Sequence, residues 1–340
     1  MIRRALELTM ENKSRPLVSI VTGVYNSSPY LKNYFHMLCL QTFEDWEVIL
    51  VDDGSKDNTC DLIEDEIKRD PRIRLARKQP EGFPSRSRAL GLSLARGKFV
   101  AFCDHDDFWA PQKLEFQLEV LRRHKDASIV HTDRFVWSKE THPQEYFRFP
   151  GKITEMPVSH QKPEQVIYKG LRIIFSSFIG NIDQVRAIGL HPDMKGVDDF
   201  YLFVRLALIG SIYHIELPLT YYFAHSGNLS HEKNIFVEGF YKVYHTLQAD
   251  GAPAKVLNSL HAQACRTEAV SLFATDRPRA LRLLIKSMRL YFIPSTLNRL
   301  AFLLVTFFIP RKIQSRIFKM VKVVKFKVPT FRDLLKIAGI

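Results

Sequence analysis

Between residues 17 and 132 the chain alternates short apolar segments with longer amphipathic ones, and this alternation limits the fold more than any other feature. The apolar segments predict strands at residues 17–22, 46–51, 73–76, 99–103 and 128–132. The segments between them predict helices at residues 29–40, 58–68, 85–95 and 111–123. Strands that alternate with helices in this way form a mostly parallel sheet with helices on both faces. The sequence therefore predicts an α/β fold.

The rest of the chain suggests how the domains are divided. Residues 138–170 are polar and contain several prolines, which predicts a loop or an irregular insert. Order is expected to return over residues 173–230, and residues 231–276 look helical. With 340 residues, 46% of them hydrophobic, the chain can hold one large domain or two modest ones. We expect a catalytic domain over residues 1–230 and a helical, basic extension over residues 231–340.

The positive charge of the chain lies almost entirely at its C-terminal end. The net charge is +13, yet residues 277–340 hold 15 Lys/Arg and one acidic residue, whereas residues 1–276 hold 34 Lys/Arg and 35 Asp/Glu. The positive net charge therefore says nothing about the chemistry of residues 1–276. It predicts that the tail meets an anionic partner.

Apolar and basic residues are interleaved in this tail at helical spacing. Arg316, Lys319, Lys322 and Lys325 recur every three residues among aliphatic and aromatic side chains. This pattern is typical of a helix that lies in a membrane surface with its basic face at anionic headgroups. A basic helical bundle packed on the domain gives a similar pattern. Nucleic-acid binding is not expected, because the tail is rich in aliphatic residues and no nucleic-acid-binding module is recognisable.

Three further features bear on location. Residues 1–7 lack the apolar core of a signal peptide. The longest uncharged apolar segment, residues 300–310, is shorter than the ~20 residues that a membrane-spanning helix needs. The four cysteines are scattered without metal-binding spacing, which is typical of reduced thiols in the cytosol. The sequence predicts a cytoplasmic protein, peripheral on the inner face of the cell membrane.

An acidic cluster, Asp104-His105-Asp106-Asp107, directly follows the predicted strand at residues 99–103. Three carboxylates within four residues repel one another unless a cation or a set of donors sits among them. Carboxylate oxygens suit Mg²⁺ or Mn²⁺, and these ions also bind phosphate oxygens. The cluster therefore indicates a metal–diphosphate site. An acidic turn that caps the helix predicted from Pro111 is the alternative.

Other motifs occur in a fixed order around this cluster. They are Tyr25-Asn26, Asp52-Asp53-Gly54-Ser55, Gly82 with Arg88, Gly196-Val197-Asp198-Asp199-Phe200, Pro218-Leu219-Thr220-Tyr221-Tyr222 and His225. Taken together, over about residues 17–230, they resemble family 2 glycosyltransferases of the GT-A fold, of the type that builds bacterial surface polysaccharides. The resemblance does not cover the tail. It implies a Rossmann-like, mostly parallel sheet.

The resemblance implies a site for a nucleotide-diphospho-sugar donor. Asp53 would accept the N3–H of a uracil or thymine base, which favours UDP or dTDP, and Tyr25 would stack on that base. Asn26 would support the turn. The structural alternatives are an aspartate that caps the Asp-Gly-Ser turn and a tyrosine buried in the core.

The resemblance also implies how the diphosphate is held. It assigns Asp106 as the ligand of Mn²⁺ or Mg²⁺ and places Asp104 near the ribose. Arg88 would contact the phosphates, with a solvated helix face as the alternative. His225 would lie near the diphosphate and the metal, although a lone histidine is often structural.

For catalysis, the resemblance assigns Asp199 as the general base, because it lies six residues before Arg205. Asp198 would assist at the acceptor, and an N-cap pair at the start of a helix is the alternative reading of the two acids. Ser176 and Ser177 would line the acceptor pocket.

The predicted activity is a metal-dependent, inverting sugar transfer from a nucleotide-diphosphate donor. The acceptor would be a hydroxyl of a glycan, expected to be lipid-linked, in the synthesis of cell-surface polysaccharide. Two other functions fit the same motifs. A nucleotidyltransferase of similar fold would release pyrophosphate, and a catalytically inactive, membrane-bound adaptor would release nothing.

Overall fold

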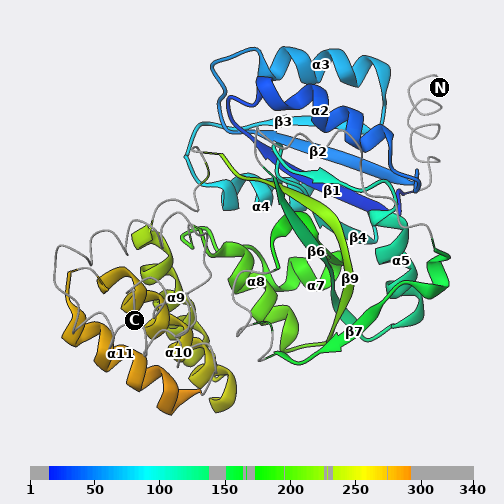
Figure 1. The fold of residues 1–340 in the computed structure, drawn as a ribbon. Helices are drawn as coiled ribbons and strands as arrows, with labels where there is room; N and C mark the ends of the chain where they lie inside the picture. Colours follow the sequence, from blue (N-terminus) through cyan, green and yellow to red (C-terminus); the bar gives the residue numbers. More distant parts are fainter. Residues whose placement is uncertain are drawn as a thin grey trace, which may run out of the picture. The chain divides into compact units, whose positions relative to one another are not determined.

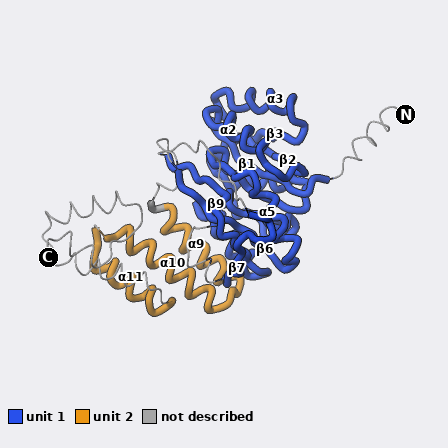
Figure 2. Tube along the Cα trace, turned by 45° about the vertical axis from the view of Figure 1, so that its right-hand side comes forward, with its two compact units in different colours: residues 1–231 blue, residues 232–340 orange. Residues whose placement is uncertain are grey.

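The computed structural model describes residues 15–137, 151–163, 166, 173–194, 196–225, 228, 233–273 and 275–291. The chain divides into two compact units, residues 1–231 and 232–340 (Figure 2). No helix within the described ranges is both long enough and apolar enough to cross a membrane.

A nine-stranded sheet forms the centre of the described part of the first unit (Figure 1). Its strands are β1 (Val18–Val24), β2 (Trp46–Asp52), β3 (Ile73–Arg77), β4 (Phe99–Phe102), β5 (Phe108–Trp109), β6 (Ala127–Trp137), β7 (Val158–Gln161), β8 (Phe178–Asn181) and β9 (Ser211–Phe223). Their order is β3-β2-β1-β4-β8-β6-β9-β5, and β7 pairs with β9.

The strand directions give the sheet its mixed but mostly parallel character. β3, β2, β1 and β4 are parallel neighbours. β8 is antiparallel to both β4 and β6, so β6 and its parallel partner β9 run in the direction of β1. β5 and β7 are antiparallel to β9. The predicted α/β fold with a mostly parallel sheet is therefore confirmed.

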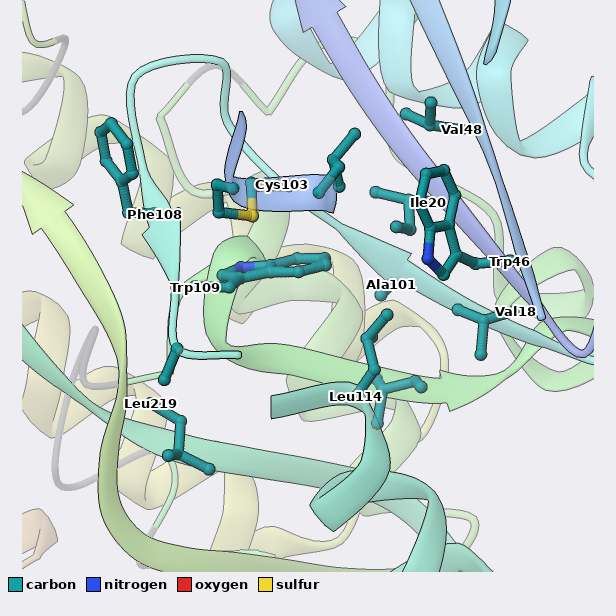
Figure 3. Close-up of a cluster of buried hydrophobic side chains, with 14 of the residues drawn as sticks. Val18, Ile20, Trp46, Val48, Ala101, Cys103, Phe108, Trp109, Leu114 and Leu219 are labelled. Carbon is teal, nitrogen blue, oxygen red and sulfur yellow. The ribbon is translucent and has the colours of Figure 1, made fainter. Parts of the chain in front are cut away.

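Helices cover both faces of the sheet, as predicted. One apolar cluster joins the strands to α2 (Ser28–Cys39), α3 (Thr59–Arg69) and α5 (Lys113–Arg123). The other joins them to α4 (Pro84–Leu94), α7 (Ile182–Ile188) and α8 (Asp198–Ala207). Neighbouring strand residues point to opposite faces, so Ile20 belongs to the first cluster and Val21 to the second. Figure 3 shows the first cluster, in which Trp109 and Leu114 lie with residues of β1 and β2.

The helix predicted to begin at Pro111 begins instead at Lys113. Pro111 precedes the N-cap residue Gln112, and its carbonyl accepts the N–H of Thr42 (2.9 Å). The reason is the short strand β5, which the sequence analysis missed. Its pairing with β9 continues into the hydrogen bond from Ala110 N to Leu219 O (2.9 Å), and this bond keeps the chain extended before the helix.

The prediction of an irregular insert over residues 138–170 is wrong for part of its described residues. A 3₁₀ turn (Ile153–Glu155) and the edge strand β7 lie there. Two of the four β7 side chains are exposed, so its sequence lacks the apolar pattern of a central strand. Its position depends on pairing with the long strand β9, which lies more than fifty residues further along the chain.

The second unit is helical in its described residues, as expected for this part of the predicted helical extension. It contains α9 (Lys233–Ala249), α10 (Ala254–Leu272) and α11 (Arg277–Leu290). On α11, Ala280, Leu284 and Ser287 are buried, whereas the basic residues Arg279, Arg282, Lys286 and Arg289 are exposed. The inner side of α11 therefore packs on protein and its outer side is basic. The remaining tail, including the basic repeat at residues 316–325, lies outside the described residues.

Candidate active site

Three parallel neighbouring strands, β1, β2 and β4, end at the same edge of the sheet. Tyr25 and Asn26 follow β1, Asp53 follows β2, and residues 104–107 follow β4. Ligands of open α/β sheets bind beyond the carboxyl ends of the strands. The fold thus brings together motifs that are separated by up to eighty residues in the sequence.

Asp53 is buried, and donors surround its carboxylate. Its Oδ1 accepts from Lys78 Nζ (2.6 Å) and from the backbone N–H of Glu81 (2.9 Å), while Oδ2 accepts from the N–H of Gly82 (2.8 Å). Gly82 has φ +70°, a left-handed conformation that suits glycine. Asp53 therefore holds the loop at residues 78–82 against the end of β2.

The neighbouring residue Asp52, not Asp53, caps the Asp-Gly-Ser turn. Its carboxylate accepts from the N–H groups of Gly54 (3.1 Å) and Ser55 (3.2 Å). The turn-capping alternative considered for Asp53 thus applies to Asp52. Asp53 is directed instead toward the loop that leads into α4.

Tyr25 and Asn26 form the turn after β1. The side chain of Tyr25 is 50% exposed, so the alternative of a tyrosine buried in the core is wrong. Asn26 has φ +47°, and its Oδ1 accepts the N–H of Lys56 (2.8 Å) while its own N–H donates to Ser55 Oγ (2.9 Å). Asn26 therefore ties this turn to the loop after β2 and leaves the Tyr25 ring free to face a ligand.

The acidic cluster after β4 forms a tight turn in which each carboxylate has a different environment. The N–H of Asp107 donates to Asp104 O (3.0 Å), and the buried Asp107 accepts the N–H of Phe223 (3.1 Å). Burial, followed by the charges of Asp106 and Asp104, raises the pKa of Asp107 well above its usual range. Because α5 begins only at Lys113, these acids do not cap it, and the capping alternative is wrong.

Asp106 pairs with a histidine from the far end of β9. Its Oδ2 lies 2.8 Å from His225 Nε2, and the ring of Tyr30 stacks on that imidazole with the centroids 5.7 Å apart. Burial raises the pKa of Asp106, but the His225 hydrogen bond and the charge of His105 outweigh it, so the net pKa is lowered. The Asp106 carboxylate and the His225 imidazole are groups of the kind that bind divalent cations.

Arg88 of α4 joins two carboxylates from different parts of the chain. Its Nη2 donates to Asp104 Oδ1 (2.6 Å) and its Nη1 to Asp198 Oδ2 (2.9 Å). The Arg88 side chain is only 12% exposed, and its guanidinium lies 4.4 Å from the centroid of the Phe175 ring. The predicted alternative of a solvated helix face is therefore wrong for this arginine.

Asp198 and Asp199 are the first two residues of α8. The N-cap is Val197, so the alternative of an N-cap pair is wrong, although both acids favourably face the positive end of the helix dipole. Asp199 Oδ1 accepts the N–H of Phe200 (2.7 Å). Burial, followed by the charge of Asp198, raises the pKa of Asp199 to about 7. A carboxylate with such a pKa is suited to accept a proton near neutral pH.

Ser176 and Ser177 are fully buried and point into the protein. Ser176 Oγ accepts the N–H of Asp104 (3.0 Å), and Ser177 Oγ bonds within its own turn to the carbonyl of Ile174 (2.9 Å). In this conformation neither hydroxyl offers the predicted contact with an acceptor, because burial removes both from the surface. Ser176 instead fixes the backbone from which the Asp104 side chain extends.

A buried polar network that the sequence analysis missed supports this turn. Trp109 Nε1 donates to Ser176 O (2.7 Å), and Gln117 Nε2 donates to Ser177 O (2.9 Å). Lys113, fully buried, donates to Gln117 Oε1 (2.8 Å). No local signal marks Trp109 and Gln117 in the sequence, because their carbonyl partners lie 67 and 60 residues further along the chain.

A match to a known family identifies the domain that holds most of these residues. Residues 19–185 match the model described as glycosyl transferase family 2. The chain contains a family 2 glycosyl transferase domain. The resemblance that the motifs indicated is thereby confirmed. The matched region includes Asp53, Arg88 and the acidic cluster, and it ends before Asp198.

Curated relatives of this domain include glycosyltransferases of bacteria. The putative teichuronic acid biosynthesis glycosyltransferase TuaG of Bacillus subtilis (strain 168) is 38% identical over 107 residues, which are 32% of this chain and 42% of that protein. The chondroitin synthase of Escherichia coli is 26% identical over 237 residues, which are 68% of this chain and 32% of that protein. The chain thus spans 42% and 32% of the length of these two relatives.

Solved structures share the fold at low sequence identity. Residues 1–349 of Staphylococcus aureus TarS in complex with UDP-GlcNAc match with a TM-score of 0.61 and 16% identity, over 83% of each chain. The mannosyltransferase PcManGT from Pyrobaculum calidifontis, in complex with GDP-Man and Mn²⁺, matches with a TM-score of 0.55 and 16% identity, over 86% of this chain and 85% of that one. The predicted GT-A fold of the family 2 domain is confirmed.

Proposed function

We propose that this protein transfers a sugar from a nucleotide-diphosphate donor to a hydroxyl of a glycan, with inversion at the anomeric carbon. One observation carries the proposal: Arg88 contacts both Asp104 and Asp198, at 2.6 and 2.9 Å. Asp104 follows the carboxyl end of β4, where the donor would bind, and Asp198 precedes the candidate base Asp199. A single guanidinium therefore links Asp104, at the donor-binding end of β4, to the residue next to the candidate base.

The donor would bind at the carboxyl ends of β1, β2 and β4. Tyr25 is exposed there and can stack on a base, and Asp53 follows the neighbouring strand β2. A carboxylate accepts the N3–H of uracil or thymine, and Lys78 beside it can donate to a base carbonyl. These groups favour UDP or dTDP as the nucleotide. The UDP-GlcNAc complex of the TarS structure is consistent with this choice.

We propose Mn²⁺ or Mg²⁺ as the cofactor, with Asp106 and His225 as its protein ligands. Their facing atoms, 2.8 Å apart, are an oxygen and an imidazole nitrogen, and Mn²⁺ accepts both. Across the described ranges, no three or more His, Cys, Asp or Glu side chains gather as a metal site. The diphosphate and water would therefore supply the other ligands. An ion held by Asp106 and His225 would supply positive charge that offsets the negative charge of the diphosphate.

Asp199 would act as the general base of the reaction. It accepts the proton of the acceptor hydroxyl while that oxygen forms a bond to the anomeric carbon. The bond from this carbon to the diphosphate oxygen breaks with its electron pair, and the nucleoside diphosphate departs. Attack opposite the leaving group inverts the anomeric centre. The raised pKa of Asp199, about 7, gives it the proton affinity that this role needs.

The acceptor would be a growing surface glycan, expected to be lipid-linked. The named relatives include a putative teichuronic acid biosynthesis enzyme and a chondroitin synthase, both of which concern polysaccharides. The protein would work as a peripheral protein at the inner face of the cell membrane. The exposed basic residues Arg282, Lys286 and Arg289 of α11 are suited to anionic headgroups. We propose residues 1–230 as the catalytic domain and residues 231–340 as the membrane-associating extension.

The testing experiment measures thermal stability with a panel of nucleoside diphosphates, with and without Mn²⁺. A nucleotide at 100 times its dissociation constant should add about 2.7 kcal/mol to the free energy of unfolding. We expect this with UDP or dTDP, dependent on the metal and lost in Asp106→Ala. Folded protein that responds to none of the nucleotides would contradict the proposal and favour an inactive adaptor.

Product analysis then tests the reaction class. Incubation with the matching nucleotide-sugar should release the nucleoside diphosphate, whereas a nucleotidyltransferase would release pyrophosphate. Release of pyrophosphate would therefore overturn the proposal even if the nucleotide binds.

A further inference from the structure

Three groups of the protein hold the Arg88 guanidinium in place, and binding a phosphate would not by itself require these contacts. It contacts Asp104 and Asp198 through different nitrogens, and its guanidinium packs over Phe175. A guanidinium that is 12% exposed loses much of its hydration, so its charge must be paired within the protein. The planar fork of arginine fixes the direction of both carboxylates, which the point charge of a lysine cannot do.

Fixing Asp198 also fixes Asp199. The two residues are consecutive at the start of α8, and the carboxylate of Asp199 bonds to the N–H of Phe200 in the same turn. Rotation of this first turn would move both acids together. The contact between Arg88 and Asp198 therefore determines where the Asp199 carboxylate stands relative to Asp104.

We propose that Arg88 is a positioning residue for the general base, holding the first turn of α8 against the donor-binding end of β4 through Asp198. This inference rests on the proposed function, in which Asp199 is the base. It adds to the phosphate contact that the family resemblance implies for Arg88, and it assigns Asp198 as the link between Arg88 and Asp199.

The charges around Asp199 make the proposal measurable. Asp198 faces it from its own helix, Arg88 from α4, and Asp104 from the turn after β4. Arg88 favours the ionised form of Asp199, whereas Asp198 and Asp104 oppose it. Replacement of Arg88 by methionine should therefore raise the pKa of Asp199, and replacement of Asp198 by asparagine should lower it.

The first test needs no activity. The difference in unfolding free energy between Asp199→Asn and the parent protein grows with pH and levels off above the pKa of Asp199. In the Arg88→Met background, we expect this stability difference to reach its plateau at a pH that is about one unit or more higher. In the Asp198→Asn background the plateau should begin at a lower pH. Arg122→Met, a 69% exposed arginine on α5, is the control and should leave it unchanged. An Arg88→Met profile that matches the control would overturn the proposal.

The second test separates positioning from phosphate binding. Asp198→Asn keeps the contact between Arg88 and Asp104, so UDP affinity should change little while transfer falls about tenfold or more. If Arg88 serves the phosphates alone, Asp198→Asn should leave transfer intact, which would contradict the proposal. If Arg88→Met does not fold, Arg88→Lys can replace it, because lysine retains the positive charge. Arg88→Lys should lower the rate of transfer about as much as Asp198→Asn does. A folded parent protein without any transfer would instead refute the proposed function, and the stability test would still decide the placement of Asp199.

Discussion

His225 Nε2 lies 2.8 Å from Asp106 Oδ2, although the two residues are 119 positions apart in the chain. The contact joins the turn after β4 to the chain that leaves β9. The ring of Tyr30, from α2, stacks on the same imidazole. Three distant segments thus meet around the His225 imidazole, in the part of the molecule where the donor diphosphate is proposed to bind.

The first prediction concerns this pair. His225→Ala should remove most of the additional stabilisation that Mn²⁺ gives to UDP binding, because one of the two proposed protein ligands is lost. Thermal shifts with UDP, measured with and without Mn²⁺, check it. His36→Ala, an exposed histidine on α2, is the matched control and should respond like the parent protein. An unchanged response to Mn²⁺ in His225→Ala would exclude His225 as a ligand.

The second prediction concerns stability and pH. Burial raises the pKa of Asp199 to about 7, so the folded state favours its protonated form. Stability from this group is therefore present below its unfolded pKa of about 3.9 and is lost as the pH rises to about 7. Asp199→Asn removes this loss of stability, and the amide oxygen of asparagine can still accept the N–H of Phe200. It should be more stable than the parent protein by about 4 kcal/mol at pH 8, and about equal at pH 4.

Chemical denaturation at several pH values checks this expectation. Asp183→Asn, an exposed acid in the first turn of α7, serves as the control. Equal stability of Asp199→Asn and the parent protein at pH 8 would show that the Asp199 carboxylate is not in the environment described here.

The third prediction concerns the rate of transfer. If Asp199 is the base, transfer should rise with pH up to about 7 and then level off, because only the ionised carboxylate accepts a proton. Asp199→Asn should lower the rate by roughly 10²- to 10⁴-fold with little change in UDP affinity. Initial rates of nucleoside diphosphate release between pH 5 and 9 would reveal it. A rate that falls from pH 5 to pH 7 would point to an acid in place of a base.

The fourth prediction compares two adjacent buried serines. Ser176→Ala leaves the N–H of Asp104 without its acceptor, which should cost about 1–3 kcal/mol of stability and weaken UDP binding. Ser177→Ala removes a hydrogen bond within its own turn, so it should lower stability while UDP affinity is retained. Calorimetric titration with UDP distinguishes them. Equal losses of UDP affinity in both variants would show that the hydrogen bond from Asp104 N–H to Ser176 is not specifically needed for UDP binding.

The fifth prediction concerns the membrane. Reversal of three exposed charges on α11, with Arg282→Glu, Lys286→Glu and Arg289→Glu, should weaken binding to phosphatidylserine vesicles by about 3 kcal/mol or more. Sedimentation with phosphatidylserine and phosphatidylcholine vesicles measures it. The same change at Lys32, Lys68 and Arg122, all exposed in the first unit, is the control. Binding that survives the α11 reversal would show that this helix face does not hold the protein to lipid.

The sequence by itself determined the α/β class and the edge of the sheet at which the acidic motifs lie. Alternating strands and helices leave few topologies, and the motifs directly follow strands that must be parallel neighbours. Val48 and Leu50 on one face of β2, with Ile49 on the other, are apolar because both faces are covered, and this is visible in the sequence. The polypeptide order of the motifs was also sufficient to indicate the family.

Only the tertiary structure decided which polar groups meet. The Arg88 bridge, the partner of Asp106 and the burial of Ser176 depend on contacts between segments far apart in the chain, and local sequence patterns carry no signal for such contacts. The start of α5 at Lys113 and the edge strand β7 were missed for the same reason, since pairing with β9 fixes both regions. The raised pKa of Asp199 likewise results first from burial, which is a property of the folded chain, and only second from the charge of its sequence neighbour Asp198.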